Sequence, residues 1–139
     1  MKVQCIAKKD LDLYRILSES ETSRHILRFY HPKRTDYGVT LEVSTVSNAL
    51  SIINEIRWYI MRYMADVLIE DADHHVYITR ELAREAYETR SVILTPGWNF
   101  EFFVCILENG ECIRVPAGVP LPADAVQTFH VWGLLAQQP

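Results

Sequence analysis

Residues 47–69, SNALSIINEIRWYIMRYMADVLI, form the longest stretch of the chain in which apolar residues have helical spacing. Ser47 is an N-cap candidate, because its hydroxyl can accept a hydrogen bond from a backbone N–H of the first turn. Residues three or four apart share one face of a helix. The residues with this spacing are Ala49, Ile53, Ile56, Ile60, Met64, Val67 and Leu68. The pattern predicts one long, mostly buried helix on which the other elements pack.

The length of this stretch would also suit a membrane span, but its charges exclude that interpretation. The ionised side chains inside it are Glu55, Arg57, Arg62 and Asp66. Each charge near the middle of a bilayer costs roughly 2.5–3.5 kcal/mol on insertion scales. We therefore expect no membrane-spanning segment in this chain.

The polar side of the predicted helix contains an unexpected aromatic residue, Trp58. Trp, Tyr and Arg are enriched among residues that dominate binding energy, and Tyr59 and Arg62 lie within about one turn of Trp58. This group predicts a contact with a protein partner. The alternatives are that another element of the same chain covers Trp58, or that a second copy covers it in a homo-oligomer. Arg57 lies on the apolar side, either as a buried functional cation or with its stem snorkelling to the edge.

Length and composition favour one ordered domain over residues 1–139. The net charge is −4, so the molecule as a whole lacks an electrostatic footprint for binding phosphate backbones. The chain has 3 cysteines, an odd number, and its first residues, MKVQCIAKKD, do not resemble a signal peptide. These features predict a reducing, cytoplasmic compartment.

Turn signals divide the segment before the long stretch into short elements. The expected elements are a strand at 2–7, a helical turn that begins at Asp10 or Asp12, a strand or helix at 24–30, and a strand at 39–43. Tyr37 and Gly38 indicate a turn between the last two of these elements. We therefore expect residues 24–43 to form a hairpin.

Further elements are expected after the long stretch. They are a strand at 75–78, a helix at 80–89 that Thr79 caps, a strand at 91–95 and a last strand at 126–134. The charges of the 80–89 helix are spaced so that they can pair on an exposed face.

Asn109 and Gly110 give a strong hairpin signal inside NFEFFVCILENGECIRVP, residues 99–116. A two-residue turn would pair Ile106 with Ile113 and make Cys105 and Cys112 diagonal neighbours. Diagonal Cα atoms lie roughly 7–8 Å apart, beyond comfortable disulfide reach, so we expect free thiols. The face expected to receive the long helix carries Phe100, Phe102, Val104, Ile106, Ile113 and Val115.

The sequence carries no recognised catalytic signature. It lacks a G-x-S-x-G elbow, and its 5 isolated glycines form no phosphate-binding loop. Residues 70–75, EDADHH, are the only metal-like constellation, but adjacent histidines in a strand would point to opposite sides. We interpret these residues as an acidic helix exit, and a metal-dependent enzyme that uses them is the third hypothesis. The sequence thus assigns no catalytic residue, metal ligand or cofactor.

Residues 24–34 form a local basic segment with interleaved aromatic residues. Its cations could bind phosphates while its rings stack on bases, as in proteins that bind single strands. The residues that would do so are Arg24, Arg28, Tyr30, Lys33 and Arg34. The alternative is a charged edge strand, because Lys and Arg oppose pairing between sheet edges. Nucleic-acid binding is therefore the second hypothesis.

Together the patterns predict a single α+β domain, with a mostly antiparallel sheet packed against one long central helix and a shorter helix. The leading hypothesis is a non-enzymatic, cytoplasmic protein-binding module. A small accessory inhibitor of a host protein or defence complex, of the kind that phages and plasmids use, would fit the chain size. The acidic residues after Trp58 would face a basic partner. The predicted contact residues are Trp58, Tyr59, Arg62, Asp66, Glu70, Asp71 and Asp73.

Overall fold

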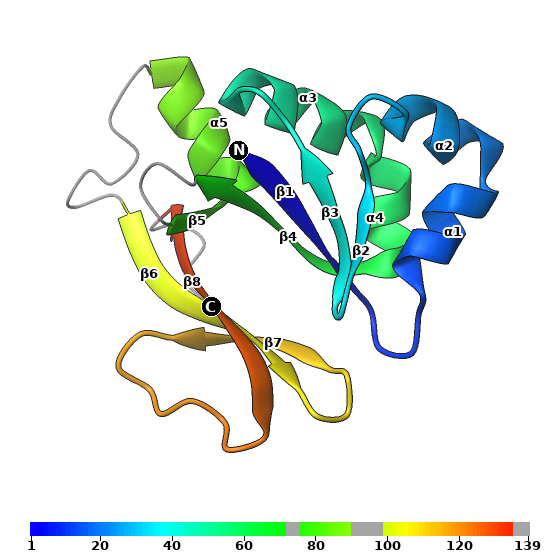
Figure 1. Ribbon diagram of the computed structural model, residues 1–139. Coiled ribbons are helices and arrows are strands. Elements are labelled where there is room, and N and C mark those ends of the chain that lie inside the picture. Colours follow the sequence, from blue (N-terminus) through cyan, green and yellow to red (C-terminus); the bar gives the residue numbers. More distant parts are fainter. Residues whose placement is uncertain (72–75, 90–98, 135–139) are drawn as a thin grey trace.

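The computed structural model describes residues 1–71, 76–89 and 99–134, which form an α+β fold with a mixed eight-stranded sheet and five helices (Figure 1). In chain order the elements are β1 (Lys2–Ala7), α1 (Leu13–Glu19), α2 (Glu21–Leu27), β2 (Lys33–Thr35), β3 (Gly38–Glu42), α3 (Val46–Glu55), α4 (Arg57–Tyr63), β4 (Met64–Asp71), β5 (Val76–Thr79), α5 (Arg80–Thr89), β6 (Asn99–Leu107), β7 (Cys112–Pro116) and β8 (Ala125–Leu134). The α+β class predicted from the sequence is confirmed. The strand predicted at 91–95 lies outside the described residues.

The strands lie in the order β2-β3-β1-β4-β5-β8-β6-β7. Within the described ranges, all neighbouring strands are antiparallel except β5 and β8, which run parallel. The sheet is therefore mixed, and β8 joins the N-terminal strands to the C-terminal hairpin of β6 and β7.

The prediction of one long helix at residues 47–69 is confirmed only in part, because two helices and the start of a strand occupy this stretch. Helix α3 ends at Glu55, the backbone of Ile56 leaves helical geometry (φ −96°, ψ 15°), and α4 ends at Tyr63. Residues 64–71 then form β4 in the middle of the sheet, between β1 and β5. A strand buried on both faces has a nearly continuous apolar run, and periodicity alone does not distinguish such a run from a buried helix.

Short polar side chains cap the beginnings of four helices. The caps are Asp12 for α1, Ser20 for α2, Thr45 for α3 and Thr79 for α5, and each accepts a hydrogen bond from the backbone N–H three residues later. The predicted starts at Asp12 and Thr79 are confirmed, whereas α3 begins after Thr45 and not at Ser47.

The prediction of a hairpin over residues 24–43 is wrong in its first part. Helix α2 takes residues 21–27, and only β2 and β3 form the hairpin, with Asp36 and Tyr37 in its turn. The hydroxyl of Ser23 donates a 2.6 Å hydrogen bond to the carbonyl of Leu17, which ties the start of α2 to α1. The helical alternative for residues 24–30 is therefore the better description of that segment.

One face of strands β1, β3, β4 and β5 is covered by the helices (Figure 1). Sheet residues such as Val3, Leu41 and Ile69 pack there against helical residues such as Ile52 and Leu82, and all are fully buried. Burying a side chain of this size stabilises the fold by about 1.5–3 kcal/mol. This face contains the larger of the two cores.

The other face of β1 and β4 is covered by the C-terminal strands, so the prediction that the 99–116 hairpin receives the long helix is wrong. Ile6 and Leu68 point to this second face and pack among Phe102, Val104 and Phe129. Successive residues of a strand face opposite sides, which explains why Leu68 belongs to this core while its neighbours Val67 and Ile69 belong to the other.

The register of the β6–β7 hairpin differs by one residue from the predicted one. Ile106 pairs with Cys112 and Cys105 pairs with Ile113, because the connection is longer than a two-residue turn. The N–H of Leu107 donates to the carbonyl of Glu111 at 2.8 Å. A one-residue shift moves every side chain of a strand to the opposite face. Cys105 and Cys112 therefore face opposite sides, and Cys5, Cys105 and Cys112 are free thiols, as predicted.

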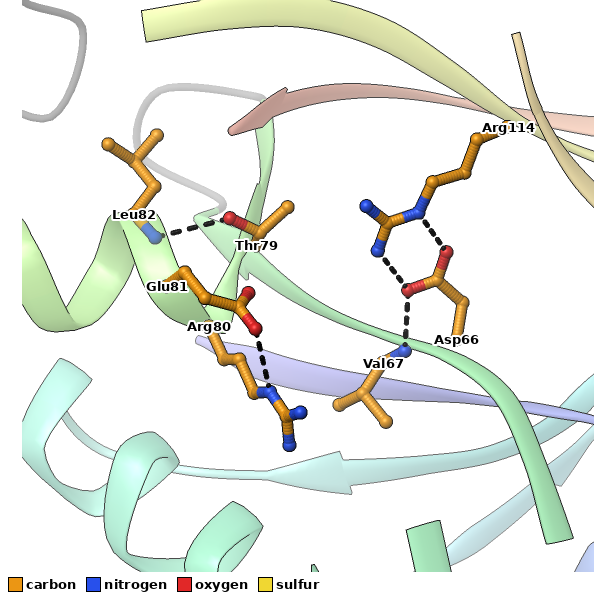
Figure 2. A network of polar contacts seen from close by, with 7 residues as sticks. All are labelled: Asp66, Val67, Thr79, Arg80, Glu81, Leu82 and Arg114. Carbon is orange, nitrogen blue, oxygen red and sulfur yellow. Dashed lines mark hydrogen bonds and ion pairs between the residues drawn. The ribbon is translucent and has the colours of Figure 1, made fainter. Parts of the chain in front are cut away.

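The same register turns Arg114 of β7 toward β4, where it forms a two-pronged ion pair with Asp66 (Figure 2). Both N···O distances are 2.9 Å, and Asp66 also accepts the backbone N–H of Val67 at 3.0 Å. The side chain of Asp66 is only 7% exposed and that of Arg114 is 33% exposed. The carboxylate raises the pKa of Arg114 above its ordinary value, chiefly through the hydrogen bond. This pair holds the C-terminal strands against β4.

We expect Asp66 and Arg114 to stabilise the fold jointly, by a coupling energy of about 1–2 kcal/mol. A double-mutant cycle of Asp66→Asn and Arg114→Gln, followed by urea unfolding, measures this energy. Arg15 and Glu19 on α1 supply the control pair, with the same 2.9 Å contact between largely exposed side chains. Their coupling should be clearly smaller, because solvent screens an exposed ion pair. Equal coupling in the two cycles would show that the Asp66 contact does not hold the strands together.

Candidate functional site

The outer face of α4 exposes two large apolar side chains beside a cation. Trp58 is 52% exposed and Met61 is 74% exposed, and Arg62 is also exposed. Residues three and four apart lie on one side of a helix, so these three side chains form a single surface. We call Trp58, Met61 and Arg62 the α4 surface.

The ring of Trp58 is held in place although it faces solvent. Its edge-to-face contacts are to Tyr59, with 5.0 Å between ring centroids, and to Tyr63, with 6.1 Å between ring centroids. The guanidinium of Arg62 lies 4.2 Å from the centroid of the Trp58 ring. Such a cation–π contact contributes about 0.5–1 kcal/mol at an exposed site. The α4 surface is therefore ordered before any partner binds.

Tyr59 supports this surface from inside the core. It is only 7% exposed, and its hydroxyl lies 2.7 Å from the hydroxyl of Ser20 at the start of α2. Tyr59, predicted from the sequence as a contact residue, therefore lies beneath the α4 surface and supports it. Met61 was not among the contact residues predicted from the sequence.

Three of the predicted acidic contact residues, Asp66, Glu70 and Asp71, lie on β4. Asp66 pairs with Arg114, Glu70 accepts a 3.1 Å hydrogen bond from the amide of Gln4, and Asp71 is buried. Burial raises the pKa of the neighbouring Tyr77 to about 12, with a further contribution from its hydrogen bond to Glu70. Asp73 lies outside the described residues. Asp66 and Glu70 thus have hydrogen-bond partners within the fold, and Asp71 is buried in it.

The basic segment 24–34 is divided between two environments. Lys33 pairs with Glu42 at 3.6 Å, and Arg34 pairs with Asp12 at 3.1 Å, so both cations already have carboxylate partners. Tyr30 is half-buried against the main core. These three residues therefore offer less to a nucleic acid than the sequence indicates.

Arg24 and Arg28 lie elsewhere, at a cavity of about 350 Å³ between α1, α2 and β3. Apolar residues line much of this cavity, among them Tyr14, Leu17, Leu27, Pro32 and Val39. Phe29 is 72% exposed, and the guanidinium of Arg28 lies 4.6 Å from its ring centroid. Part of the predicted basic and aromatic group thus lies together on the surface, as Arg24, Arg28 and Phe29, whereas Tyr30 does not belong to it.

In the part of the chain that the structure describes, little supports metal binding or catalysis by a thiol. No group of three or more His, Cys, Asp or Glu side chains gathers there as metal ligands. Residues 72–75, which hold most of the predicted metal-like cluster, lie outside that part. Burial raises the pKa of Cys5 and of Cys112 to about 12, which keeps both thiols protonated and weakly nucleophilic. His130 contacts Glu101 at 2.7 Å and is thus engaged away from the thiols.

Among the described helices, none has both the length and the apolar composition that crossing a membrane requires. The charges of α4 and the early break at Ile56 account for this result.

No curated protein and no solved structure matches this chain. A family model matches residues 1–94, which include β1 to α5 and all three residues of the α4 surface. This match covers more than half of the 139 residues. The chain therefore belongs to the family of unknown function DUF5804.

Proposed function

We propose that this chain is a non-enzymatic protein-binding module whose contact site is the α4 surface of Trp58, Met61 and Arg62. The observation that carries the proposal is an exposed Trp58 ring held between aromatic neighbours and a stacked arginine. Trp and Arg are the residue types most enriched among those that dominate binding energy.

The order of the α4 surface bears directly on affinity. Binding costs about 0.5–1.5 kcal/mol for each flexible side chain that becomes immobilised at an interface. Tyr59, Tyr63 and Arg62 already restrain Trp58, so its side chain loses most of its freedom on folding and little more on binding. Met61 is the adaptable member of the surface, because a thioether chain fills irregular gaps.

The side chains of the α4 surface indicate which groups a partner must present. Trp58 and Met61 require an apolar pocket, and the guanidinium of Arg62 requires a carboxylate at the rim of that pocket. The partner is therefore an apolar surface edged by acidic residues, and not the basic surface that the sequence suggested. Inhibition of a host protein or defence complex is one form that such binding would take.

We expect a partner captured from nuclease-treated lysate of the source cells to bind a Trp58→Ala/Arg62→Ala variant at least about 30-fold more weakly. This factor corresponds to the loss of about 2 kcal/mol that defines a dominant contact residue. Titration of the purified partner onto the wild-type chain and the variant measures it. Both replaced side chains are exposed, so the variant should keep the unfolding midpoint of the wild type within a few degrees.

Phe29→Ala is the control, since Phe29 is an exposed aromatic residue just beyond the end of α2. It should leave partner affinity unchanged. If the double variant kept full affinity while folded, the α4 surface would not be the contact site.

The cavity of about 350 Å³ beside Arg24 and Arg28 favours a second candidate function, the binding of a single-stranded nucleic acid. The exposed ring of Phe29 would stack on a base while the two arginines contact phosphates. The charge balance of the whole molecule opposes this function, so it ranks below protein binding.

If Arg24 and Arg28 each neutralise one phosphate, the logarithm of the affinity for a short single strand should fall with the logarithm of salt with a slope of about −1.4. Fluorescence anisotropy across a salt series measures this slope. Arg24→Gln should reduce it by about half. Salt-independent binding, or none at low salt, would remove this candidate.

A further inference from the structure

A cavity of about 230 Å³ lies between α3 and α5, and arginines dominate its lining. The cavity is bordered by Ile53, Asn54, Arg57, Arg80, Glu81 and Arg84. Three guanidinium groups and one carboxylate thus gather in one depression of a molecule whose net charge is −4. The fold thus concentrates positive charge here, although the molecule as a whole is negative.

Only one of the three arginines has an ion pair within the described ranges. Arg80 donates through Nε to Glu81 at 3.0 Å, and Figure 2 shows this pair at the start of α5. Neither Arg57 nor Arg84 forms a salt bridge to any residue that the structure describes, and both are exposed. The cavity therefore carries two uncompensated positive charges.

Two of these arginines lie close enough on α5 to repel each other. Arg80 and Arg84 are four residues apart on α5 and lie on the same side of that helix, where like charges repel. Arg57 is the first residue of α4, next to the end of α3, and borders the same cavity. An anion in this depression would offset that repulsion.

We propose that this cavity binds a dianionic phosphate group, carried by a small phosphate monoester or present as free phosphate. A terminal phosphate carries about −1.5 to −2 charges near neutral pH, which matches the two uncompensated arginines. A carboxylate or a phosphodiester carries a single charge and would leave one cation unmatched. The planar guanidinium groups of Arg57 and Arg84 can each donate two parallel hydrogen bonds to phosphate oxygens.

Two neighbouring features complete the site. The side-chain amide of Asn54 offers a further donor at the α3 wall of the cavity. Helix α5 spans ten residues and starts at Arg80, so the positive end of its dipole lies beside the cavity. Both features favour an anion over a neutral ligand. The site uses residues different from those of the α4 surface, so it stands without the proposed protein binding.

Titration of the full chain with phenyl phosphate at pH 7.5, followed by amide chemical shifts, tests the proposal. Saturable shifts should centre on Asn54, Arg57 and Arg84. Phenyl sulfate has the same shape and one negative charge, and it should bind about tenfold more weakly. Binding of phenyl phosphate should also weaken below about pH 6, where the second phosphate proton binds. Inorganic phosphate forms a second arm, which distinguishes a site for the free ion from one for an ester.

Arg57→Gln and Arg84→Gln should each weaken phenyl phosphate binding at least about tenfold, because each removes a charge-assisted contact. Arg15→Gln is the control, since it removes one exposed charge outside this cavity and should change the affinity less than twofold. Thermal melts of each variant establish that it is folded. Equal binding of phenyl sulfate, equal effects of the three variants, or no saturable binding of either phosphate would overturn the proposal.

Discussion

Strand β4 has apolar side chains on both faces, and each face requires its own cover. Val67 and Ile69 point toward the helices, and Leu68 points toward the C-terminal strands. If the helices alone covered the sheet, Leu68 and Ile6 would lie in water on the other face, at a cost of about 1.5–3 kcal/mol for each side chain. The C-terminal strands supply the second cover, and the Asp66–Arg114 ion pair fastens them to β4 (Figure 2). The arrangement of two cores, one on each face of the sheet, follows from this one strand.

The same constraint shapes the surfaces that we assign to function. The chain returns to the sheet at Met64, and the helical segment before it breaks at Ile56. Two neighbouring residues of this segment serve two sites: Arg57 borders the cavity beside α5, and Trp58 projects from the outer face of α4. Successive residues of a helix point about 100° apart, so these two side chains lie on different sides. The phosphate and protein-binding proposals therefore both rest on the short helical segment before β4.

Local signals predicted the parts of this fold that local chemistry controls. Asp12 and Thr79 marked helix starts because their side chains cap the first turn, and Asn109 and Gly110 marked a real hairpin. The errors arose where long-range packing decides. The apolar run from Met64 has the same appearance in a buried strand as in a buried helix. The partnership of Asp66 with Arg114 depends on a hairpin register that the sequence does not show, so Asp66 was assigned to a surface.

The boundary between α4 and β4 is the point on which this account depends most. Backbone chemical shifts of residues 46–71, measured by NMR on the full chain, test it directly. The account predicts helical shifts through Tyr63, with a local departure at Ile56, and extended shifts from Met64 to Asp71. It also predicts contacts between Hα atoms of β4 and β1 across the antiparallel pairs. Continuous helical shifts through Ile69 would contradict the central strand, and the two-sided core with it.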